Sequence, residues 1–376
     1  MKKIAIFGGT FNPVHVEHKR IVESAIEELG LDKVIVVPTN LPPHKKTELA
    51  TSFDRINMLK LCFLGNEKVE ISDFEITNGG TSYTYLTLEH FKNVYKDTKL
   101  FFLVGGDMLV DFKNWRNPER ILGCCELAVF GREDFIVDKK VESEIFKSKY
   151  NKSFLTLKYQ GKKLSSTEIR ILSALGLSLE GKVEPKVEKY IIDNDIYSLS
   201  DASELVKKTL PKKRLVHTAQ VTVCALKKAK ELNLDREKVI TACLLHDVAK
   251  YIDYKTVDGF LLPKGVPEPV IHAFLGAYIA ENHLKIQDQE VIDAIRYHTS
   301  GKAKMSDLAK LLFVADMIEP GRDYEGVEYL RSLYETDFEK CFRECIKEET
   351  VHLINKKAVI YEETLNAYEY YINQKN

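Results

Sequence analysis

A string of glycines and histidines near the start of the chain has the residue types of a phosphate-binding turn. Residues 8–18 read GGTFNPVHVEH and follow the apolar run at residues 3–7. The two glycines let backbone approach a ligand closely, and the free amides at a helix N-terminus favour an anion. His15 and His18 stand three residues apart, so on one helical turn they present two imidazoles to the same place. The string predicts a site for a phosphate-bearing ligand.

A second group of chemically capable residues lies in the C-terminal half. His246 and Asp247 are adjacent in the apolar run LLHDVAK at residues 244–250. A buried carboxylate there is costly unless it binds a cation, whereas a lone histidine on an apolar helix face is more often a hydrogen-bonded core residue than a ligand. The candidate metal ligands, each in a predicted helix or at its end, are His217, His246, Asp247, His272, His298 and Asp316. Imidazoles and carboxylates without thiolates suit a borderline divalent cation bound in the core of a helical bundle.

The elements that must position the first string alternate between strand and helix. β-rich runs cover residues 3–7, 33–38, 99–104 and 126–130, and helical periodicity covers residues 16–29 and 81–96. Gly30 stands where a helix C-cap is expected. This alternation predicts an α/β fold with a doubly wound, largely parallel sheet.

Strand patterns stop at about residue 166. The string SSTEIRILSALG has a capping hydroxyl and a closing glycine, so it predicts a short helix, and residues 185–197 predict another. We place a domain boundary in the polar segment that follows, which gives domains at residues 1–198 and 199–376. Later helical patterns cover residues 214–233, 236–250, 268–283, 288–298, 303–318 and 337–354. The second domain is therefore predicted to be all-α.

Composition narrows the class of protein. A chain of 376 residues exceeds one ordinary domain of about 100–200 residues, so two cores are expected. The net charge is −1 and neither half carries the basic excess of a nucleic-acid binder. No apolar stretch approaches the roughly 18 residues of a membrane span. Neither a GxxxxGKS/T nor a GxGxxG string occurs, so kinases and dehydrogenases lack their usual motifs.

The cysteines and the N-terminus indicate the compartment. The seven cysteines are odd in number and form no CxxC pair, which is typical of a reducing cytoplasm without structural zinc. The opening MKKIAIFGGT has only a short apolar run and no cleavage pattern after it, so we interpret it as a first strand, not a signal peptide. The chain is predicted to be cytoplasmic.

Two motifs in the first domain resemble those of the adenylyl- and cytidylyltransferase superfamily. Residues 8–18 resemble its GGxFxPxHxGH motif, and LSSTEIR at residues 164–170 resembles its second motif, ISxTxxR. Further matches narrow the resemblance to nicotinate mononucleotide adenylyltransferase; these are PPHK at 42–45, TSYT at 81–84, GGD at 105–107, Trp115 and Arg132. The resemblance extends to about residue 197 and implies a Rossmann-like nucleotidyltransferase fold.

That resemblance implies a reaction in which ATP, accompanied by Mg²⁺, and nicotinate mononucleotide give nicotinate adenine dinucleotide and pyrophosphate. The attacking phosphate is already an anion, so the site must stabilise charge on the α-phosphate and the departing pyrophosphate and needs no general base. By resemblance the catalytic residues are His15, His18, Lys45 and Arg170. The implied nucleotide-binding residues are Gly8, Gly9, Thr10, Phe11, Ser165, Ser166, Thr167, Thr84, Asp107, Trp115 and Arg132. Whether the acid or the amide mononucleotide is preferred stays open.

Three positions in this domain carry alternatives. Glu17 stands where the resembled motif usually has glycine, and if it points inward its charge should repel a triphosphate. Asn12 replaces the commoner aspartate. Trp115, expected by resemblance to stack on the pyridine ring, is the only tryptophan, and a single tryptophan is more often a core residue.

The helical half resembles small bacterial HD proteins that cleave diadenosine tetraphosphate symmetrically to two ADP. The matching segments are RLVHT at 214–218, LLHDVAK at 244–250, HAFLGAY at 272–278, IRYHTSGKAKMS at 295–306 and FVADMIEPGRD at 313–323. The resemblance, over about residues 203–370, implies that the six ligand candidates bind two metal ions and that Asp247 is also catalytic. It points to iron, with manganese or another divalent cation as alternatives. Candidate polyphosphate contacts, which are otherwise ordinary solvated cations, are Lys250, Arg296, Lys302 and Arg322.

The favoured hypothesis is a bifunctional enzyme acting on ATP, nicotinate mononucleotide and diadenosine tetraphosphate, with no nucleic-acid or membrane partner. A second hypothesis keeps the adenylyltransferase and makes the HD half a phosphohydrolase for another nucleotide or a nucleotide-sensing regulatory module. A pure binding or tRNA-handling protein is the remaining class. Assembly into a homo-oligomer is left open.

Overall fold

The computed structural model describes residues 1–40, 50–132, 139–162, 164–197 and 201–373. Within these residues the chain forms two compact units. The first comprises the described residues of Met1–Arg170 and Leu179–Tyr197, and the second comprises residues 171–178 and those from 201 onward. The predicted boundary at residues 198 and 199 lies outside the described residues.

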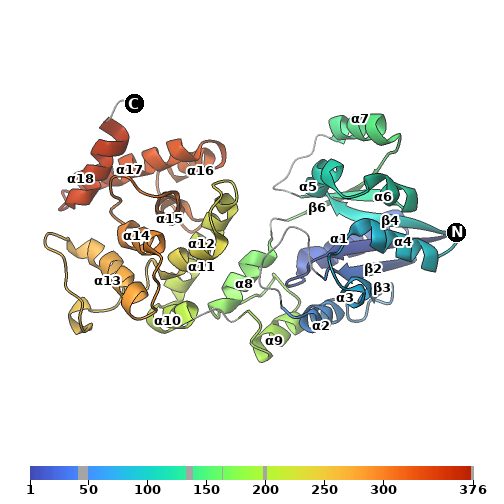
Figure 1. Cartoon of the computed structure of the whole chain (residues 1–376), viewed down its shortest axis with the longest axis horizontal. Helices are drawn as coiled ribbons and strands as arrows, with labels where there is room; N and C mark the ends of the chain where they lie inside the picture. The colour runs from blue at the N-terminus through green and yellow to red at the C-terminus, as the bar shows by residue number, and fades with distance from the viewer. Residues whose placement is uncertain (41–49, 133–138, 163, 198–200, 374–376) are drawn as a thin grey trace. The chain divides into compact units, whose positions relative to one another are not determined.

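A six-stranded parallel sheet forms the centre of the first unit. Its strands lie in the order β3-β2-β1-β4-β5-β6, and all neighbouring pairs are parallel (Figure 1). The strands are β1 (Lys2–Gly9), β2 (Lys33–Pro38), β3 (Val69–Ile71), β4 (Thr98–Gly105), β5 (Glu126–Arg132) and β6 (Leu155–Gly161). The predicted doubly wound α/β fold is confirmed.

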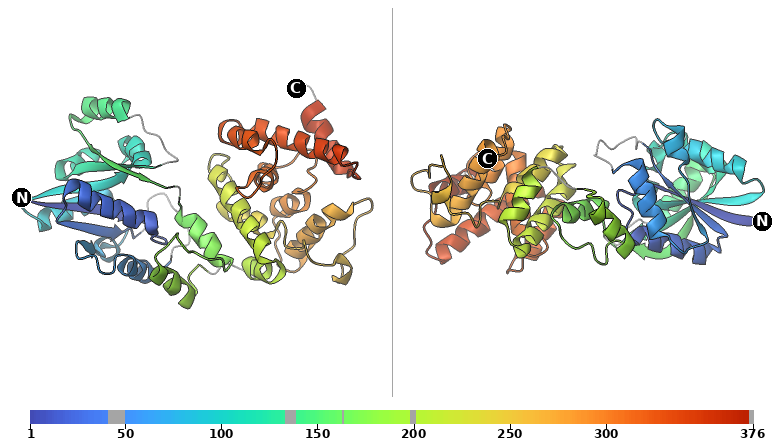
Figure 2. Two further views of the ribbon diagram at one scale, coloured as in Figure 1. Left: turned by 180° about the vertical axis from the view of Figure 1, so that it is seen from behind. Right: turned by 90° about the horizontal axis from the view of Figure 1, so that it is seen from below.

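Helices lie on both faces of this sheet (Figure 2). On one face, Ile4 and Ile6 of β1 pack with Leu88 and Phe91 of α4 (Thr84–Val94). On the other face, α1 (Val16–Leu29) contacts β2 and β6. Burial on both faces explains why β1 is a continuous apolar run instead of an alternating one.

The prediction for α1 is confirmed to the residue, and the helix ends at Gly30 in the left-handed conformation with φ 60°. The remaining helices assigned to the first unit are α2 (Ser52–Cys62), α3 (Phe74–Asn78), α5 (Gly106–Asp111), α6 (Pro118–Cys124), α7 (Lys139–Tyr150) and α9 (Pro185–Asp193). Helix α8 (Ser166–Ala174) begins in the first unit and ends in the second.

The sequence patterns do not predict two of the strands. β3 has only three residues, too few for a periodic signal. β6 is the last strand in the sheet order, and its sequence LTLKYQG mixes lysine and glutamine with apolar residues. Only one edge of β6 pairs with another described strand, so it lacks the apolar run of the buried strands.

The second unit is helical, and none of its described residues forms a strand, so the all-α prediction is confirmed. Ile171, Leu175 and Leu177 join its hydrophobic core. In the described part of the chain, no helix combines the length and apolar character that a membrane crossing requires. The helices are α10 (Asp201–Thr209), α11 (Lys212–Ala229), α12 (Arg236–Leu245), α13 (Glu268–Asn282), α14 (Gln289–Tyr297), α15 (Asp307–Ile318), α16 (Val327–Thr336), α17 (Phe338–Asn355) and α18 (Glu362–Tyr368).

One predicted helix is too long. The pattern at residues 236–250 predicts a single helix, but α12 ends at Leu245 and the chain continues in turns. The backbone N–H of Val248 donates to Leu245 O and that of Lys250 donates to Asp247 O, both spanning three residues. His246 and Asp247 therefore lie in a tight turn at the helix end.

Candidate functional site

The glycine–histidine string forms the connection from β1 to α1. His15 is the N-cap of α1 and its ring stacks on that of His18, with centroids 3.6 Å apart. The backbone N–H of His15 donates to Nδ1 of His18 at 3.2 Å. Because Nδ1 accepts this bond, the proton of a neutral His18 is on Nε2, which makes Nε2 the donor. The spacing of His15 and His18 predicts that their imidazoles lie close together, and in the structure they do.

Gly9 is required here for space. A Cβ at this position would lie 2.9 Å from the ring of Phe11, closer than side chains tolerate. Phe11 itself has φ 47° and packs edge-on against His18 at 5.0 Å between centroids. The absence of a side chain at residue 9 therefore leaves room for the Phe11 ring to pack against His18.

The second motif closes directly on this string. Arg170 donates from Nη1 to the carbonyl oxygen of Asn12 at 2.6 Å and from Nη2 to Thr167 Oγ1 at 3.0 Å. Ser166 Oγ donates to the carbonyl oxygen of Pro13 at 2.9 Å. Ser165 caps the start of α8, where its Oγ accepts from the backbone N–H of Glu168 at 3.1 Å. Two motifs about 150 residues apart in sequence thus form one surface.

A buried arginine that the sequence analysis did not single out donates hydrogen bonds to the backbone of the glycine–histidine string and of a neighbouring segment. Arg55 of α2 is 1% exposed and donates to the carbonyl oxygens of Thr10 at 3.0 Å and Thr39 at 2.7 Å. Its burial lowers the pKa of the guanidinium. An arginine in the sequence SFDRINMLKLC carries no mark of burial, because arginine on an amphipathic helix usually faces water.

The carboxylate of Glu17 is turned toward β6, where Tyr159, Lys162 and Arg20 bond to it; its repulsion of a triphosphate stays a prediction. Its side chain is buried; Oε2 accepts from Tyr159 Oη at 2.7 Å and from the backbone N–H of Lys162 at 2.8 Å. Oε1 accepts from Arg20 at 2.6 Å. Burial alone would raise the pKa of Glu17, but these hydrogen bonds and the charge of Arg20 lower it. The carboxylate is held against β6.

Asn12 also has a structural explanation. Its Oδ1 accepts from the backbone N–H of Ala50 at 3.0 Å and from Tyr197 Oη at 2.8 Å. Either amide or carboxylate oxygen can accept such bonds, so asparagine can replace aspartate at this position.

The other predicted nucleotide-binding residues lie on three different elements of the first unit. β1 and β4 are neighbours where the strand order reverses, the position at which ligands bind in open α/β sheets. Asp107 lies in the first turn of α5, directly after β4, and Thr84 is the first residue of α4. Arg132 is the last residue of β5. Lys45 lies outside the described residues.

The contacts of Trp115 bear on both roles considered for it, which are stacking on a ligand and packing in the core. It is partly buried and packs edge-on against Phe102 at 6.2 Å and tilted against Phe112 at 5.4 Å between centroids. One part of the indole therefore belongs to the core. Its partial exposure is consistent with a ring that also meets a ligand.

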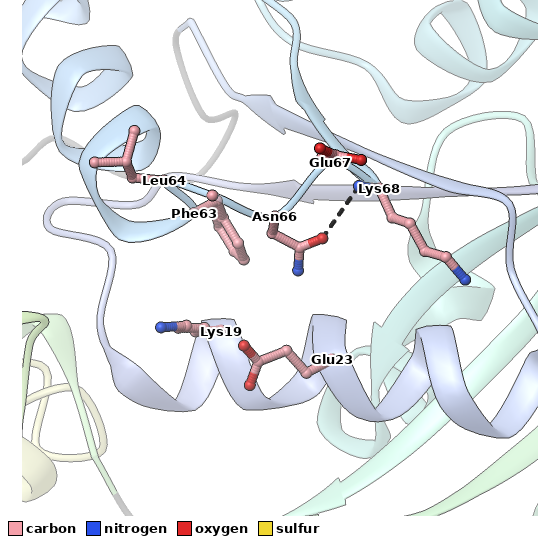
Figure 3. A pocket seen from close by; sticks show the side chains of 8 residues that line it. Lys19, Glu23, Phe63, Leu64, Asn66, Glu67 and Lys68 are labelled. Carbon is pink, nitrogen blue, oxygen red and sulfur yellow. Dashed lines mark hydrogen bonds between the residues drawn. The ribbon is translucent and has the colours of Figure 1, made fainter.

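A hollow of about 480 Å³ lies on another part of the first unit (Figure 3). Lys19 and Glu23 of α1 line it together with residues 63–68. Lys19 pairs with Glu184 at 3.0 Å. No predicted nucleotide-binding residue lines this hollow, so it adds nothing to the site at residues 8–18.

In the second unit, Asp247 lies at the centre of a cluster of histidines. Its Oδ2 is 3.4 Å from His246 Nε2 and 3.8 Å from His217 Nε2. Its Oδ1 is 3.2 Å from His272 Nε2 and 3.8 Å from His298 Nε2. The two carboxylate oxygens therefore face different pairs of histidines, and a carboxylate so placed can give one oxygen to each of two cations.

The donor atoms form two groups that are compact enough to hold metal ions. One contains His217, His246 and Asp316, the other His246, Asp247 and His298, and within each the ligand atoms lie within 4.8 Å of one another. His272 Nε2 lies 3.3 Å from His298 Nε2, beside the second group. All six predicted ligands are thus brought together, and their nitrogen and oxygen donors fit borderline divalent cations.

His272 and Asp247 are in the protonation states that metal binding requires, whereas the pKa of His217 is lowered by burial but raised overall by hydrogen bonds to Asp316 and Glu319. Burial, followed by the nearby charges of His298 and Lys250, lowers the pKa of His272 to about 4, so its imidazole is neutral at pH 7. Burial opposes ionisation of Asp247, yet the surrounding histidines lower its pKa well below the usual range. Neutral imidazole and ionised carboxylate are the forms that bind metal ions.

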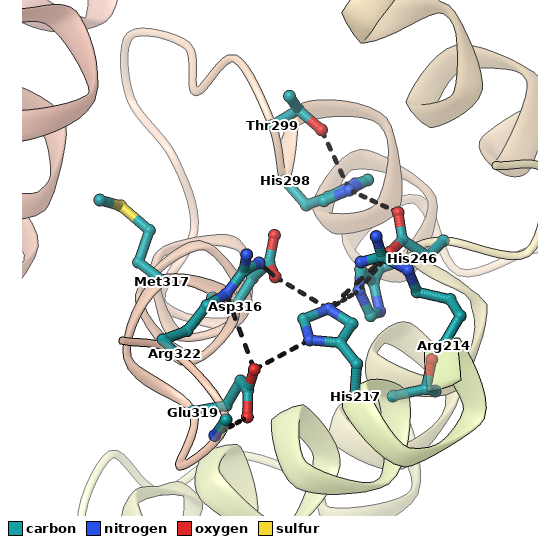
Figure 4. A network of polar contacts seen from close by, with 12 residues as sticks. Arg214, His217, His246, His298, Thr299, Asp316, Met317, Glu319 and Arg322 are labelled. Carbon is teal, nitrogen blue, oxygen red and sulfur yellow. Dashed lines mark hydrogen bonds and ion pairs between the residues drawn. The ribbon is translucent and has the colours of Figure 1, made fainter. Parts of the chain in front are cut away.

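Backbone carbonyls and a further carboxylate orient the ligands. His246 Nδ1 lies 2.7 Å from the carbonyl oxygen of Cys243, and His298 Nδ1 lies 2.7 Å from that of Ile295. His217 Nδ1 lies 3.1 Å from Glu319 Oε1, while its Nε2 is 3.1 Å from Asp316 (Figure 4). Such partners fix the ring and leave the opposite nitrogen for a metal.

Glu319 and Arg214 are the residues of this site that the sequence did not suggest. Arg214 pairs with Asp247 Oδ2 at 2.8 Å. Glu319 follows Asp316 by three residues and Arg214 precedes His217 by three, so helical spacing from the predicted ligands was the available signal. Both are among the residues drawn in Figure 4.

The candidate polyphosphate contacts divide into two pairs. Arg322 lies beside the cluster and pairs with Asp316 at 2.5 Å, and Lys250 Nζ is 3.7 Å from Asp247 Oδ1. Arg296 and Lys302 instead both pair with Asp293, at 3.4 Å and 2.5 Å. The structure therefore places only Lys250 and Arg322 in contact with predicted metal ligands among these four.

Comparison with known proteins gives two family matches. A cytidylyltransferase-like family model matches residues 6–171, and an HD domain model matches residues 214–321. A solved structure described as a predicted HD superfamily hydrolase involved in NAD metabolism, from Clostridium acetobutylicum, is 30% identical and covers 46% of this chain and 96% of its own, with a TM-score of 0.42.

Two curated relatives match longer stretches. A Mycoplasma genitalium protein named probable nicotinate-nucleotide adenylyltransferase/Ap4A hydrolase is 28% identical over 86% of this chain and 89% of its own. A Fusobacterium nucleatum protein named probable nicotinate-nucleotide adenylyltransferase is 40% identical over 192 residues, which are 50% of this chain and 96% of that protein. With its motifs joined at Arg170 and Asn12, the chain belongs to the nicotinate-nucleotide adenylyltransferase family.

Proposed function

We propose that the chain is a bifunctional enzyme. Its first unit transfers the adenylyl group of ATP to nicotinate mononucleotide, and its second hydrolyses diadenosine tetraphosphate to two ADP. The observation that carries this proposal is the Mycoplasma relative, whose name joins these two activities and which matches 86% of the chain. The contact of Arg170 with Asn12 and the cluster around Asp247 support one activity each.

In the first reaction, a phosphate oxygen of nicotinate mononucleotide attacks the α-phosphorus of ATP, and the bond to the β-phosphate breaks to release pyrophosphate. We assign His15 and His18 to hydrogen bonding of the phosphates, with Nε2 of His18 as a donor. Ser165, Thr167 and Arg170 would hold the triphosphate, together with Mg²⁺ and Lys45. Charge is spread by fixed donors, which is how phosphoryl and nucleotidyl transfer are accelerated.

In the second reaction, addition of water across the central phosphoanhydride of diadenosine tetraphosphate gives two ADP. We assign His217, His246, Asp247, His272, His298 and Asp316 as ligands of two metal ions, iron by preference. The ions would supply activation of the attacking water and neutralisation of phosphate charge. Glu319 would orient His217, while Arg322 and Lys250 would approach phosphate oxygens.

Two single substitutions in the full chain test whether each unit carries the activity proposed for it. Arg170→Ala should abolish pyrophosphate release from ATP and nicotinate mononucleotide while ADP formation from diadenosine tetraphosphate continues. His246→Ala should do the reverse. If the unsubstituted chain releases no pyrophosphate with nicotinate or nicotinamide mononucleotide, the first assignment is wrong. If it binds metal but forms no ADP, the second unit is a sensor or acts on another nucleotide.

The metal is identified by loading and counting. Apoprotein reconstituted anaerobically with Fe²⁺, Mn²⁺ or Zn²⁺ should bind about two ions per chain, which elemental analysis measures. Iron-loaded protein should give the highest rate of ADP formation. A higher rate with Mn²⁺ would replace iron in the assignment and leave the two-metal site intact.

We further propose a cytoplasmic location. All seven cysteines, each within the described residues, are free thiols, which is consistent with a reducing compartment. Cell fractionation with an antibody against the chain tests this, and recovery in a membrane or secreted fraction would contradict it.

A further inference from the structure

Two carboxylates of α1 accept hydrogen bonds from the backbone of β6 and of the residue that follows it. Glu28 accepts from the backbone N–H groups of Lys158 at 2.7 Å and Tyr159 at 3.2 Å. Eleven residues earlier, about three helical turns, Glu17 accepts from the backbone N–H of Lys162 at 2.8 Å. β6 pairs with β5, but their register shifts between the pairs Val129–Thr156 and Gly131–Gln160, so Lys158 and Tyr159 lie outside the ladder. Helix α1 is therefore attached to the middle of β6 and to the residue that follows its end at Gly161.

The attachment at Glu17 is the firmer of the two. Glu17 is 4% exposed, whereas Glu28 is exposed. Tyr159 Oη also donates to Glu17, at 2.7 Å, and Arg20 pairs with it at 2.6 Å. Hydrogen bonds to a charged acceptor in a buried place are stronger than those made in water. A bond to the backbone of Lys162 fixes the path of the chain as well as a side chain.

That path leads directly into the second motif. In the sequence the motif begins at Leu164, two residues after Lys162, and its last residue, Arg170, donates to the carbonyl oxygen of Asn12 in the first motif. Glu17 lies between His15 and His18 in the sequence. Lys162 and Arg170, which stand on either side of most of the second motif, thus each bond to the segment at residues 12–17.

We propose that Glu17 is a positioning residue for adenylyl transfer. By holding the backbone of Lys162, it sets the start of the second motif against the histidine pair and so completes the triphosphate site. This inference rests on the proposed adenylyltransferase activity. The resembled motif has glycine at this position, and glycine has no side chain to accept these hydrogen bonds. The bond between Glu17 and the backbone of Lys162 is therefore an addition to the motif.

The two roles considered for Glu17, positioning and charge repulsion, predict opposite changes in the KM for ATP when the residue is replaced. If Glu17 acted as a negative charge against ATP, its replacement by glycine would lower the KM for ATP. If Glu17 positions the second motif, replacement loosens the triphosphate site and raises that KM. The KM for nicotinate mononucleotide should change little in either case, because the tie is made to the ATP side of the proposed site.

The experiment measures kcat and both KM values in the full chain for Glu17→Gly, Glu17→Gln and Tyr159→Phe. Glu17→Gly should raise the KM for ATP about tenfold, the factor that a loss near 1.4 kcal/mol produces. Glu17→Gln keeps an oxygen that can accept from Lys162, so it should restore most of the loss. Tyr159→Phe removes one donor and should raise the KM for ATP by about threefold.

Glu28→Gln is the matched control, because it weakens the other attachment of α1 to β6 without touching the second motif. Its KM for ATP should stay at the unsubstituted value. An equal rise in Glu28→Gln, or an unchanged or lower KM in Glu17→Gly, overturns the inference. If Glu17→Gly does not fold, an unchanged KM for ATP in Tyr159→Phe overturns it instead. Absence of activity in the unsubstituted chain is distinguishable, because it contradicts the proposed function.

Discussion

The guanidinium of Arg170 donates to the main-chain carbonyl of Asn12 at 2.6 Å, so the second motif of the nucleotidyltransferase unit is fastened to the backbone of the first. A second nitrogen of the same group donates to Thr167 at 3.0 Å. A planar, forked cation can donate to both partners at once.

Arg170→Lys should therefore fail although it conserves charge. A lysine ammonium cannot span Asn12 and Thr167 together, so the two motifs lose their common support. We expect kcat/KM for ATP to fall by at least about 100-fold, on the order of 2.7 kcal/mol. Pyrophosphate release measures the loss, and an unchanged unfolding temperature from the fluorescence of Trp115, which lies in the first unit, serves as the folding control. A loss below about threefold would show that charge alone suffices.

Glu319→Ala should weaken metal binding in the second unit without removing a ligand. Glu319 holds His217 at Nδ1, and loss of such an outer partner typically costs about 10–100-fold in metal affinity. Competition with a chelator of known affinity measures the change. Asp293→Ala is the matched control, since Asp293 pairs with Arg296 and Lys302 but with none of the predicted ligands. Equal affinities in the two variants would contradict the role given to Glu319.

Removal of metal should separate the two activities. Dialysis of the full chain against a chelator, followed by return to buffer with Mg²⁺ only, should abolish ADP formation and leave pyrophosphate release intact. Unfolding of the second unit should also shift to lower temperature, because bound ligand stabilises the folded form by mass action. Retention of ADP formation after complete removal of iron, manganese and zinc would rule out a resident metal centre.

Gly9→Ala should destabilise the first unit. The added Cβ would lie 2.9 Å from the ring of Phe11, and overpacking of this kind costs about 1–3 kcal/mol. Trp115 is the only tryptophan, so its fluorescence reports unfolding of the first unit alone. Gly8→Ala is the control for stability, because its Cβ would meet only Phe102 at an ordinary 3.8 Å. Similar unfolding temperatures for both variants would contradict the packing argument.

The stabilising effect of Glu17 should depend on pH. Its folded-state pKa is lowered from the usual 4.5, so its contribution is complete above that value and is lost as the pH falls through the folded-state pKa. The gap in unfolding temperature between the unsubstituted chain and Glu17→Gln should be constant near neutral pH and close in acid. Trp115 fluorescence from about pH 3 to about pH 7 measures it. A gap that does not change with pH would contradict the ionised state assigned to Glu17.

Much of the fold could be predicted because its signals are local. The bounds of α1 follow from apolar periodicity and from Gly30, whose left-handed backbone closes the helix. β6 escaped prediction because it is the last strand in the sheet order, and Lys158 and Gln160 interrupt its apolar pattern.

The candidate sites, like the fold, contain residues that could be found from the sequence and residues that could not. Residue type and order were enough to select Asp247 and the five other ligand candidates, because few other roles require so many histidines and carboxylates in or beside predicted helices. Arg55 and the contacts of Glu17 could not be found from sequence, since their partners are main-chain atoms contributed by distant segments. Side-chain chemistry is visible in a sequence, but a hydrogen bond to a particular carbonyl or amide is visible only after folding.

The capping of β6 by Glu17 and Glu28 also bears on how the chain behaves in a crowded solution. An uncovered strand edge offers a row of amide and carbonyl groups to which another molecule can add a strand, which is a route to aggregation. Here carboxylates already accept from the backbone N–H groups of Lys158, Tyr159 and Lys162, so these donors are not available to an added strand. The same two side chains thus protect the sheet from growing into its neighbours.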